Sequence, residues 1–265
     1  MSYLYETHLH TSQASACGVS PGREYVERYL DLGYTGIIVT DHFYRGNTAI
    51  AKYLPWDKWV NKFCQGYEDA AEEGEHYGLD VFFGWEETFQ GDDYLVYGLG
   101  KEWLLEHPEV RYWTRREQFE EVRRHGGCVV RAHPFRQAYY IDCIRFSLGS
   151  VDAIEIANAG NEPSSDALAR VYAGKFGLPA TAGSDIHYAG DIRQNTVFGV
   201  YLEKKMKSIS DYVAAIRGNA IGGLKFPSGR CDLYGNERVR LPVEIRDERD
   251  QIVRTSLEEF LGLRS

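Results

Sequence analysis

Short apolar runs alternate with longer amphipathic stretches along most of the 265-residue chain. The runs have the length of strands and are rich in Val, Ile or aromatic residues, which favours β-structure. We expect strands at 36–40, 81–84, 94–98, 128–132, 153–157, 178–182 and 196–202.

The segments between these runs carry helix start and stop signals. Ser20-Pro21 precede the first such segment and Gly33 follows it, as expected for a capped helix. We expect helices at 23–32, 57–77, 114–124, 164–176 and 208–217. Alternating strands and helices predict an α/β fold with a mostly parallel sheet, open or closed into a barrel. The length is also compatible with a closed barrel.

The chain changes character from Pro227 onward, where it becomes charged and loses the alternating pattern. We interpret residues 1–226 as the barrel domain and residues 227–265 as an appendage. We expect this appendage to form a hairpin and a short helix that pack outside the barrel.

Histidines and acidic residues follow the predicted strands. They lie after the first apolar stretch and after the strands that begin at 36, 81, 128 and 178. In parallel α/β folds these strand ends share one face, where active sites form. Side chains from distant segments should therefore meet at one mouth; they are His8, His10, Asp41, His42, Glu86, Glu87, His133, Asp185 and His187.

Imidazole nitrogens and carboxylate oxygens together suit Zn, Mn, Fe or a similar divalent ion. Alternate residues of a strand point the same way, so His8 and His10 can bind one ion together. Asp185 and His187 have the same spacing, and a carboxylate such as Glu86 can bridge two ions. Only one of Glu86 and Glu87 should face the mouth, and we favour Glu86.

Composition limits the classes of partner. The net charge of -9 disfavours nucleic acid and anionic membrane surfaces as partners. Five cysteines without CxxC spacing argue against a disulfide framework and a thiolate zinc site. The chain has no signal-like or membrane-spanning apolar segment, so we expect a cytoplasmic protein. The sequence does not indicate an oligomeric state.

Five segments resemble the PHP (polymerase and histidinol phosphatase) family of metal-dependent phosphoesterases, and they occur in the family's order. They are THLHTS at 7–12, VTDHF at 39–43, FGWEE at 83–87, RAHPFR at 131–136 and AGSDIH at 182–187. The resemblance implies a distorted (β/α)7 barrel, similar to a TIM barrel, with two or three divalent metal ions at the carboxyl ends of the strands.

The resemblance also implies a ligand set. By analogy, the first ion is held by His8, His10, Glu86 and Asp185. Glu86 would bridge to a second ion held also by His133, and a third would belong to His42 and His187. The chain departs from the family pattern where further ligands to the second and third ions often lie. Asp93 or Tyr94 would have to substitute at the second ion, and Ser12, Ser15 or Cys17 at the third.

The function expected from this resemblance is hydrolysis of a small phosphomonoester, such as a nucleotide or metabolite phosphate, by metal-activated hydroxide. Arg136 and Arg193 follow metal motifs and are candidates for binding the phosphoryl group, with surface salt bridges as the alternative. His42 or His187 would protonate the leaving alkoxide if its local ion is weakly bound or absent. The specific substrate stays open.

Three other functions stay open. A phosphodiesterase or exonuclease of the same fold would need a basic binding stripe, which the chain lacks. An amidohydrolase of similar architecture would commonly use a lysine at a strand end. A metal-binding regulatory module without activity is also compatible with the incomplete second and third ligand sets.

Overall fold

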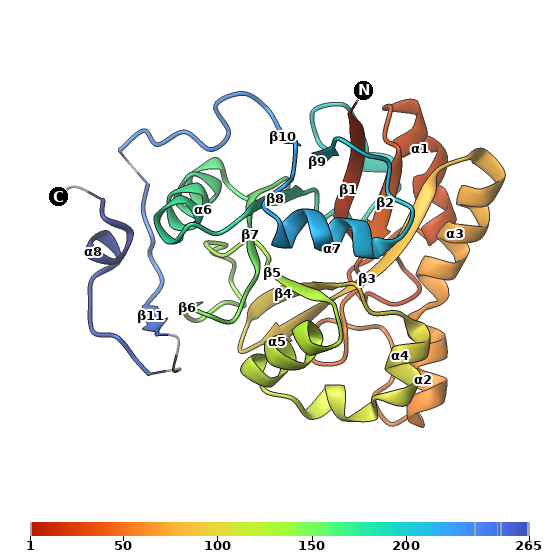
Figure 1. Ribbon diagram of the computed structural model, residues 1–265, viewed down its shortest axis with the longest axis horizontal. Helices are drawn as coiled ribbons and strands as arrows, with labels where there is room; N and C mark the ends of the chain where they lie inside the picture. Colours follow the sequence, from red (N-terminus) through yellow and green to blue (C-terminus); the bar gives the residue numbers. More distant parts are fainter. Residues whose placement is uncertain (1, 236, 248, 250, 264–265) are drawn as a thin grey trace.

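The computed structural model describes residues 2–235, 237–247, 249 and 251–263. Within these residues, nine strands form one mixed sheet, which lies at the centre of the molecule with helices around it (Figure 1). In spatial order the strands are β10 (Gly223–Lys225), β9 (Gly199–Leu202), β1 (Tyr3–Leu9), β2 (Gly36–Val39), β3 (Asp80–Phe89), β4 (Asp92–Tyr97), β5 (Cys128–Arg131), β7 (Ala153–Asn158) and β8 (Ala180–Gly183).

The sheet nearly closes on itself between β1 and β8. Asp185, which follows β8, donates its backbone N–H to the carbonyl of His8 at 2.7 Å. His10 donates its backbone N–H to the carbonyl of Ile186 at 2.9 Å. The strands from β1 to β8 therefore form the expected distorted barrel. Strands β9 and β10 pair beyond β1 and are additional to a (β/α)7 arrangement.

The sheet is less parallel than the strand–helix alternation predicts. Four neighbouring pairs are parallel, and β4 is antiparallel to both β3 and β5. Only Gln90 and Gly91 separate β3 from β4, and both have positive φ, 55° and 84°. A two-residue hairpin turn needs this backbone, so β4 returns beside β3 without an intervening helix. As a result β4 begins, rather than ends, at the mouth.

Helices surround the sheet. The α-helices are α1 (Val26–Asp31), α2 (Trp56–Phe63), α3 (Gln65–Tyr77), α4 (Lys101–Glu106), α5 (Arg115–Arg124), α6 (Pro163–Phe176), α7 (Ile209–Arg217) and α8 (Leu257–Leu261). Short 3-10 helices span Gly22–Tyr25, Pro108–Tyr112 and Ala189–Asp191. The expected helix at 57–77 is two helices that meet at Cys64. No helix of the described residues combines the length and apolar character that crossing a membrane requires.

The interior of the barrel is filled by inward-facing side chains and sealed by α7. Alternation along the strands separates an inner set from an outer one. Leu95 and Tyr97 of β4 join the interior cluster, whereas Tyr94 and Val96 join the cluster under the outer helices. Tyr212 of α7 packs edge-on against Tyr97, with ring centroids 5.0 Å apart. The interior core thus lies at the end of the barrel where α7 packs.

An irregularity in β1 decides where its histidines point. Leu4 and Leu9 belong to the same outer cluster although five positions separate them, which simple alternation forbids. The pairing of β1 with β2 shifts register between Glu6 and Leu9. Such a bulge re-aims the residues that follow it. His8 and His10 consequently face the inside of the barrel.

The C-terminal segment packs along one side of the barrel. Strand β11 (Val243–Arg246) pairs in parallel with β6 (Ile144–Ser147). After β11, Arg246 forms an antiparallel bridge with Ile252, and Asp247 donates its backbone N–H to the carbonyl of Gln251 at 3.0 Å. Helix α8 lies beside α6, where the Phe260 ring is 5.0 Å from Phe176 and 5.4 Å from Phe146 between centroids. The sequence analysis expected a hairpin in this segment and did not predict that β11 would pair with β6.

Candidate metal centre

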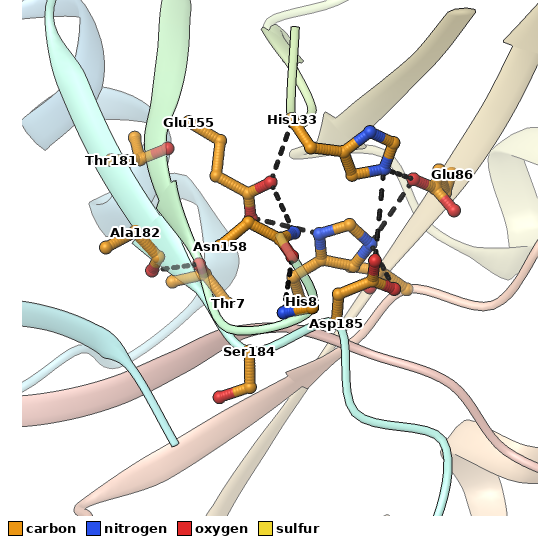
Figure 2. Close-up of polar contacts among 12 residues, drawn as sticks. Thr7, His8, Glu86, His133, Glu155, Asn158, Thr181, Ala182, Ser184 and Asp185 are labelled. Carbon is orange, nitrogen blue, oxygen red and sulfur yellow. Dashed lines mark hydrogen bonds and ion pairs between the residues drawn. The ribbon is translucent and has the colours of Figure 1, made fainter. Parts of the chain in front are cut away.

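Side chains from four separate strands converge at the mouth of the barrel (Figure 2). His8 Nε2 lies 3.2 Å from His10 Nε2, 3.3 Å from Glu86 Oε1 and 3.4 Å from Asp185 Oδ1. His10 Nε2 lies 3.1 Å from Asp185 Oδ1. On the other side of the cluster, His133 Nε2 lies 3.2 Å from Glu86 Oε1. All five side chains are buried.

The remaining predicted histidines adjoin this group. His42 Nδ1 lies 2.8 Å from Glu86 Oε2, and the His10 ring stacks against His42 and His187 with centroids 4.3 and 4.5 Å apart. The potential ligand atoms gather in three overlapping sets: His8, His10 and Asp185; His8, Glu86 and His133; and His10, His42 and His187. The structure therefore brings together every residue for which we predicted metal ligation.

Glu155 of β7 fixes the orientation of two of these histidines. Its Oε1 accepts from His8 Nδ1 at 3.0 Å, and its Oε2 accepts from the backbone N–H of His133 at 3.0 Å and from Asn158 Nδ2 at 2.8 Å. Because a carboxylate only accepts, His8 Nδ1 donates to Glu155, and Nε2 is the ring nitrogen that faces the cluster. Figure 2 shows Glu155 on the far side of His8 from Glu86.

A second chain of hydrogen bonds orients His10. The Ser15 hydroxyl donates to Asp41 Oδ1 at 2.6 Å, and its oxygen lies 3.1 Å from His10 Nδ1. Since the single hydroxyl proton goes to Asp41, His10 Nδ1 must donate to Ser15, and His10 Nε2 presents a lone pair. Thr11 holds Asp41 from its backbone N–H at 2.6 Å and its hydroxyl at 2.7 Å.

The backbone at two cluster positions is strained. His133 has a φ of 27° and Asp185 a φ of 55°, values that favour glycine. Residues other than glycine hold such conformations where the surrounding structure imposes them, often at functional sites. Both residues directly follow the strands that aim them at the mouth, β5 and β8.

The cluster depresses the pKa of its central carboxyl groups. Burial raises the pKa of Glu86, but His8 and His42 outweigh this effect and hold it well below its usual value. Burial also raises the pKa of Asp185, and Arg136 together with His8 brings it well below its usual value. Both groups are therefore negatively charged carboxylates at neutral pH and attract cations.

The histidines divide into two classes. Burial lowers the pKa of His8, but the carboxylates of Glu155 and Asp185 raise it well above its usual value. His42 behaves in the same way, because Glu86 outweighs the effect of burial on its pKa. Burial lowers the pKa of His10 well below its usual value, and the neighbouring His42 and His187 lower it further.

These residues fit a set of divalent cations. Because Nδ1 of each ring is committed to its own partner, the two Nε2 atoms face each other across 3.2 Å. A divalent cation that displaces the Nε2 proton of His8 can take both atoms as ligands. His42 Nδ1 and Glu86 Oε2 are buried and close, but neither forms a properly aligned hydrogen bond. Buried polar atoms are ordinarily satisfied. Mixed nitrogen and oxygen donors in this number are those that Zn, Mn or Fe would take.

Alternation along β3 and β4 settles which neighbouring side chains reach the cluster. Glu86 points inward, whereas Glu87 pairs with Arg45 at 3.2 Å. Asp93 lies 3.7 Å from His133 Nε2, close enough to contribute to the same set. Tyr94 points outward, with Arg131 over its ring. Asp93, rather than Tyr94, is therefore available beside His133.

Cys17 is available beside the outermost histidines. It lines a cavity of about 510 Å³ together with His42 and His187. Burial raises the pKa of its thiol, but hydrogen bonds with these two histidines bring the value down to about 6. A thiol with this pKa is largely thiolate at neutral pH and can bind a metal ion.

The two predicted arginines have different environments. Arg136 lies at the cluster: its guanidinium donates to Asp185 Oδ2 at 2.6 Å, Asn158 Oδ1 at 2.9 Å and Asn161 Oδ1 at 2.9 Å. Arg193 is exposed and donates to the carbonyl of Gly190. It lines neither of the two cavities that border the cluster. Arg193 therefore lies away from the cluster in this structure, and its role in binding the phosphoryl group stays a prediction.

Sequence reasoning missed Glu155 and Glu6. Both are buried acidic residues in otherwise apolar strands, a pattern that itself signals a dedicated partner. Glu6 accepts from the backbone N–H groups of Thr7, His8 and Ser184, each at 2.9 Å, and so braces the bulge of β1 against the end of β8.

Solved structures share this architecture. A two-domain protein from Bacteroides vulgatus, which contains a predicted PHP-like metal-dependent phosphoesterase, matches with a TM-score of 0.61 and 15% identity. The match covers 85% of this chain, which spans 65% of the length of that protein. The chain has a PHP-like fold. PsfC from Pseudomonas syringae matches with a TM-score of 0.56 and 14% identity, over 87% of this chain and 93% of PsfC.

No protein-family model and no curated protein sequence matches the chain. At 14–15% identity, the structural comparisons establish the PHP-like fold alone. The metal-binding character rests on the clustered ligand atoms at the mouth of that fold.

Proposed function

We propose that the protein is a metal-dependent phosphoesterase that hydrolyses a small phosphomonoester. The convergence of His8, His10, Glu86 and Asp185, with the tautomers of both histidines fixed, carries this proposal. His8, His10, Glu86 and Asp185 would hold the first ion. When bound, divalent ions lower the pKa of water and neutralise charge on phosphoryl oxygens.

The second and third ions would use the flanking residues. Glu86 and His133, with Asp93 nearby, would hold the second ion. His42 and His187, with Cys17 beside them, would hold the third. These assignments combine the ligand set that the family resemblance implies with the side chains that lie close together at the mouth of the barrel.

The chain's own groups would perform the remaining steps. Water adds its oxygen to phosphorus, the ester P–O bond breaks, and the departing alkoxide takes up a proton. When the third ion is absent, His187 and His42 are suited to supply that proton, because their side chains are 29% and 14% exposed whereas those of His8 and His10 are fully buried. Arg136 neutralises one oxygen of Asp185 and borders the cavity where the phosphoryl group would bind.

The test is turnover of 4-nitrophenyl phosphate, followed by a panel of phosphorylated metabolites, after addition of Mn²⁺ or Zn²⁺. We expect metal-stimulated phosphate release that the His10→Ala/Asp185→Ala double variant abolishes together with bound metal. The matched control replaces one exposed histidine and one exposed acid of α3, His76 and Glu75, with alanine.

Full activity in the His10→Ala/Asp185→Ala variant would contradict the mechanism. Bound metal without turnover of any phosphate ester would instead support a metal-binding module.

A further inference from the structure

A large cavity extends from the metal cluster toward the C-terminal segment. It has a volume of about 830 Å³, within the range of small-molecule sites. It shares Arg136, Tyr140, Asp185 and His187 with the 510 Å³ cavity that contains His42 and Cys17. A substrate bound at the cluster can therefore extend its leaving group into this larger space.

The far wall of this cavity is basic. Arg238 and Arg240 line it from the C-terminal segment, and Arg136 lines it on the cluster side. Both C-terminal arginines are exposed. Although the whole chain carries a net charge of -9, three guanidinium groups line this one cavity. Guanidinium groups in such a position favour carboxylate or phosphate.

One glutamine holds these arginines in place. Gln137 Nε2 donates to the carbonyl of Arg238 at 2.9 Å, and Gln137 Oε1 accepts from the backbone N–H of Arg240 at 2.7 Å. Gln137 directly follows Arg136, which pairs with Asp185 in the cluster of candidate ligands at the mouth of the barrel. Arg136 therefore contacts the cluster while Gln137 contacts the C-terminal segment. Together they set the positions of Arg238 and Arg240 relative to the candidate metal ligands.

The acidic residues of the cavity lie elsewhere on its wall. Asp185 is already paired with Arg136. Glu162, the other acidic residue of the lining, is the N-cap residue of α6. With Asp185 neutralised by Arg136, an anionic group in the cavity would be attracted to the guanidinium groups of Arg238 and Arg240.

We infer that Arg238 and Arg240 form a subsite for a second anionic group of the substrate, a carboxylate or phosphate distant from the ester that is cleaved. This inference rests on the proposed function and narrows its substrate class to phosphomonoesters with a second negative charge. The C-terminal segment, outside the barrel, would then determine substrate specificity while the barrel supplies the reaction centre.

Titration calorimetry with non-hydrolysable probes tests this subsite directly. The Mn²⁺-loaded protein is titrated with ω-carboxyalkylphosphonates and with alkylphosphonates of equal chain length, from about three to eight carbons, to sample the length of the cavity. At the best length we expect the carboxylate to tighten binding by about tenfold. The Arg238→Ala/Arg240→Ala variant should lose this preference, and Arg240→Glu should reverse it.

The matched control is Arg249→Ala/Arg254→Ala, which removes two exposed arginines of the same segment that do not line the cavity and should keep the preference. Equal binding of both probe series at every length, or a preference that survives in Arg238→Ala/Arg240→Ala, would overturn the inference. A carboxylate preference in a protein that cleaves no phosphomonoester would retain the subsite and reject the hydrolytic function.

Discussion

At the scale of single residues, the site depends on groups that do not face the cluster themselves. Glu155 contacts His8 through Oε1 and both His133 and Asn158 through Oε2. It thereby connects two strands and turns Nε2 of His8 toward the cluster. Partners of this kind commonly change metal affinity nearly as strongly as the ligands do.

Replacing Glu155 with glutamine should weaken metal binding. The amide keeps the shape of the side chain, but its single oxygen cannot accept from both His8 Nδ1 and His133 N. We expect Mn²⁺ affinity to fall by about 10- to 100-fold, measured by calorimetry. Glu203→Gln, at an exposed position, is the control. Unchanged affinity in Glu155→Gln would show that His8 is oriented by other contacts.

Metal binding should release protons. The pKa values of His8 and His42 are raised well above the usual value in the metal-free protein, so both rings are in the charged form at neutral pH, with a proton on each nitrogen. An ion must displace these protons, whereas His10, with its lowered pKa, is already neutral. We expect about two protons to leave per protein as the sites fill, and metal affinity to increase as pH rises. Calorimetry in two buffers of different ionisation enthalpy measures this release, and identical heats in both would contradict it.

At the scale of secondary-structure elements, α3 braces the mouth from behind. A Cβ atom added at Gly66 would lie 2.0 Å from Thr11 Oγ1 and 3.0 Å from Asp41 Oδ2. Thr11 and Asp41 form the hydrogen-bond chain that orients His10. The close approach of the helix to this chain therefore requires glycine.

Gly66→Ala should destabilise the fold and weaken metal binding together. Alanine is the better helix former, but displacing Thr11 should outweigh that gain and lower the free energy of unfolding by about 1–3 kcal/mol. Gly174→Ala in α6 is the matched control, because nothing lies within 4 Å of its added Cβ. We expect that variant to be more stable by about 0.5–1 kcal/mol. Urea unfolding measures both values, and equal effects would exclude the proposed contact.

The elements also show what the pattern of the sequence can predict. Strand-length apolar runs and polar residues at their ends indicated an α/β sheet and the segments that meet at one of its edges. The closure of that sheet into a barrel was implied only by the family resemblance. The pattern did not reveal the bulge between Glu6 and Leu9, because a bulge is defined by pairing with β2. It also missed Glu155, whose importance becomes clear only when β7 lies next to His8 and His133. Periodicity also could not show that Arg193 donates to the carbonyl of Gly190, because that contact depends on the 3-10 turn that precedes it.

At the scale of the whole molecule, the C-terminal segment is packed onto the barrel at several points. Arg230 donates to Asp166 at 2.7 Å near the start of α6, and α8 covers the aromatic side of that helix. Strand β11 adds pairing with β6. Through these contacts the C-terminal segment should stabilise the barrel, and through Arg238 and Arg240 it forms part of the wall of the 830 Å³ cavity.

Phe260→Ala should reveal that contribution. The Phe260 ring packs against Phe146, Tyr172 and Phe176. Removing it should lower the free energy of unfolding by about 3 kcal/mol, because a cavity replaces these contacts. Ile252→Ala, at a residue that is 60% exposed in the same segment, should have almost no effect. A single unfolding transition with little change in Phe260→Ala would indicate an independent tail.

The central claim concerns cations at the mouth of the barrel, and anomalous diffraction from crystals soaked in Mn²⁺ tests it most directly. We expect two or three anomalous peaks among the described ligand atoms, the strongest enclosed by His8, His10, Glu86 and Asp185. Crystals of His10→Ala/Asp185→Ala should lose that peak. An intact cluster without anomalous density at saturating Mn²⁺ or Zn²⁺ would contradict the account.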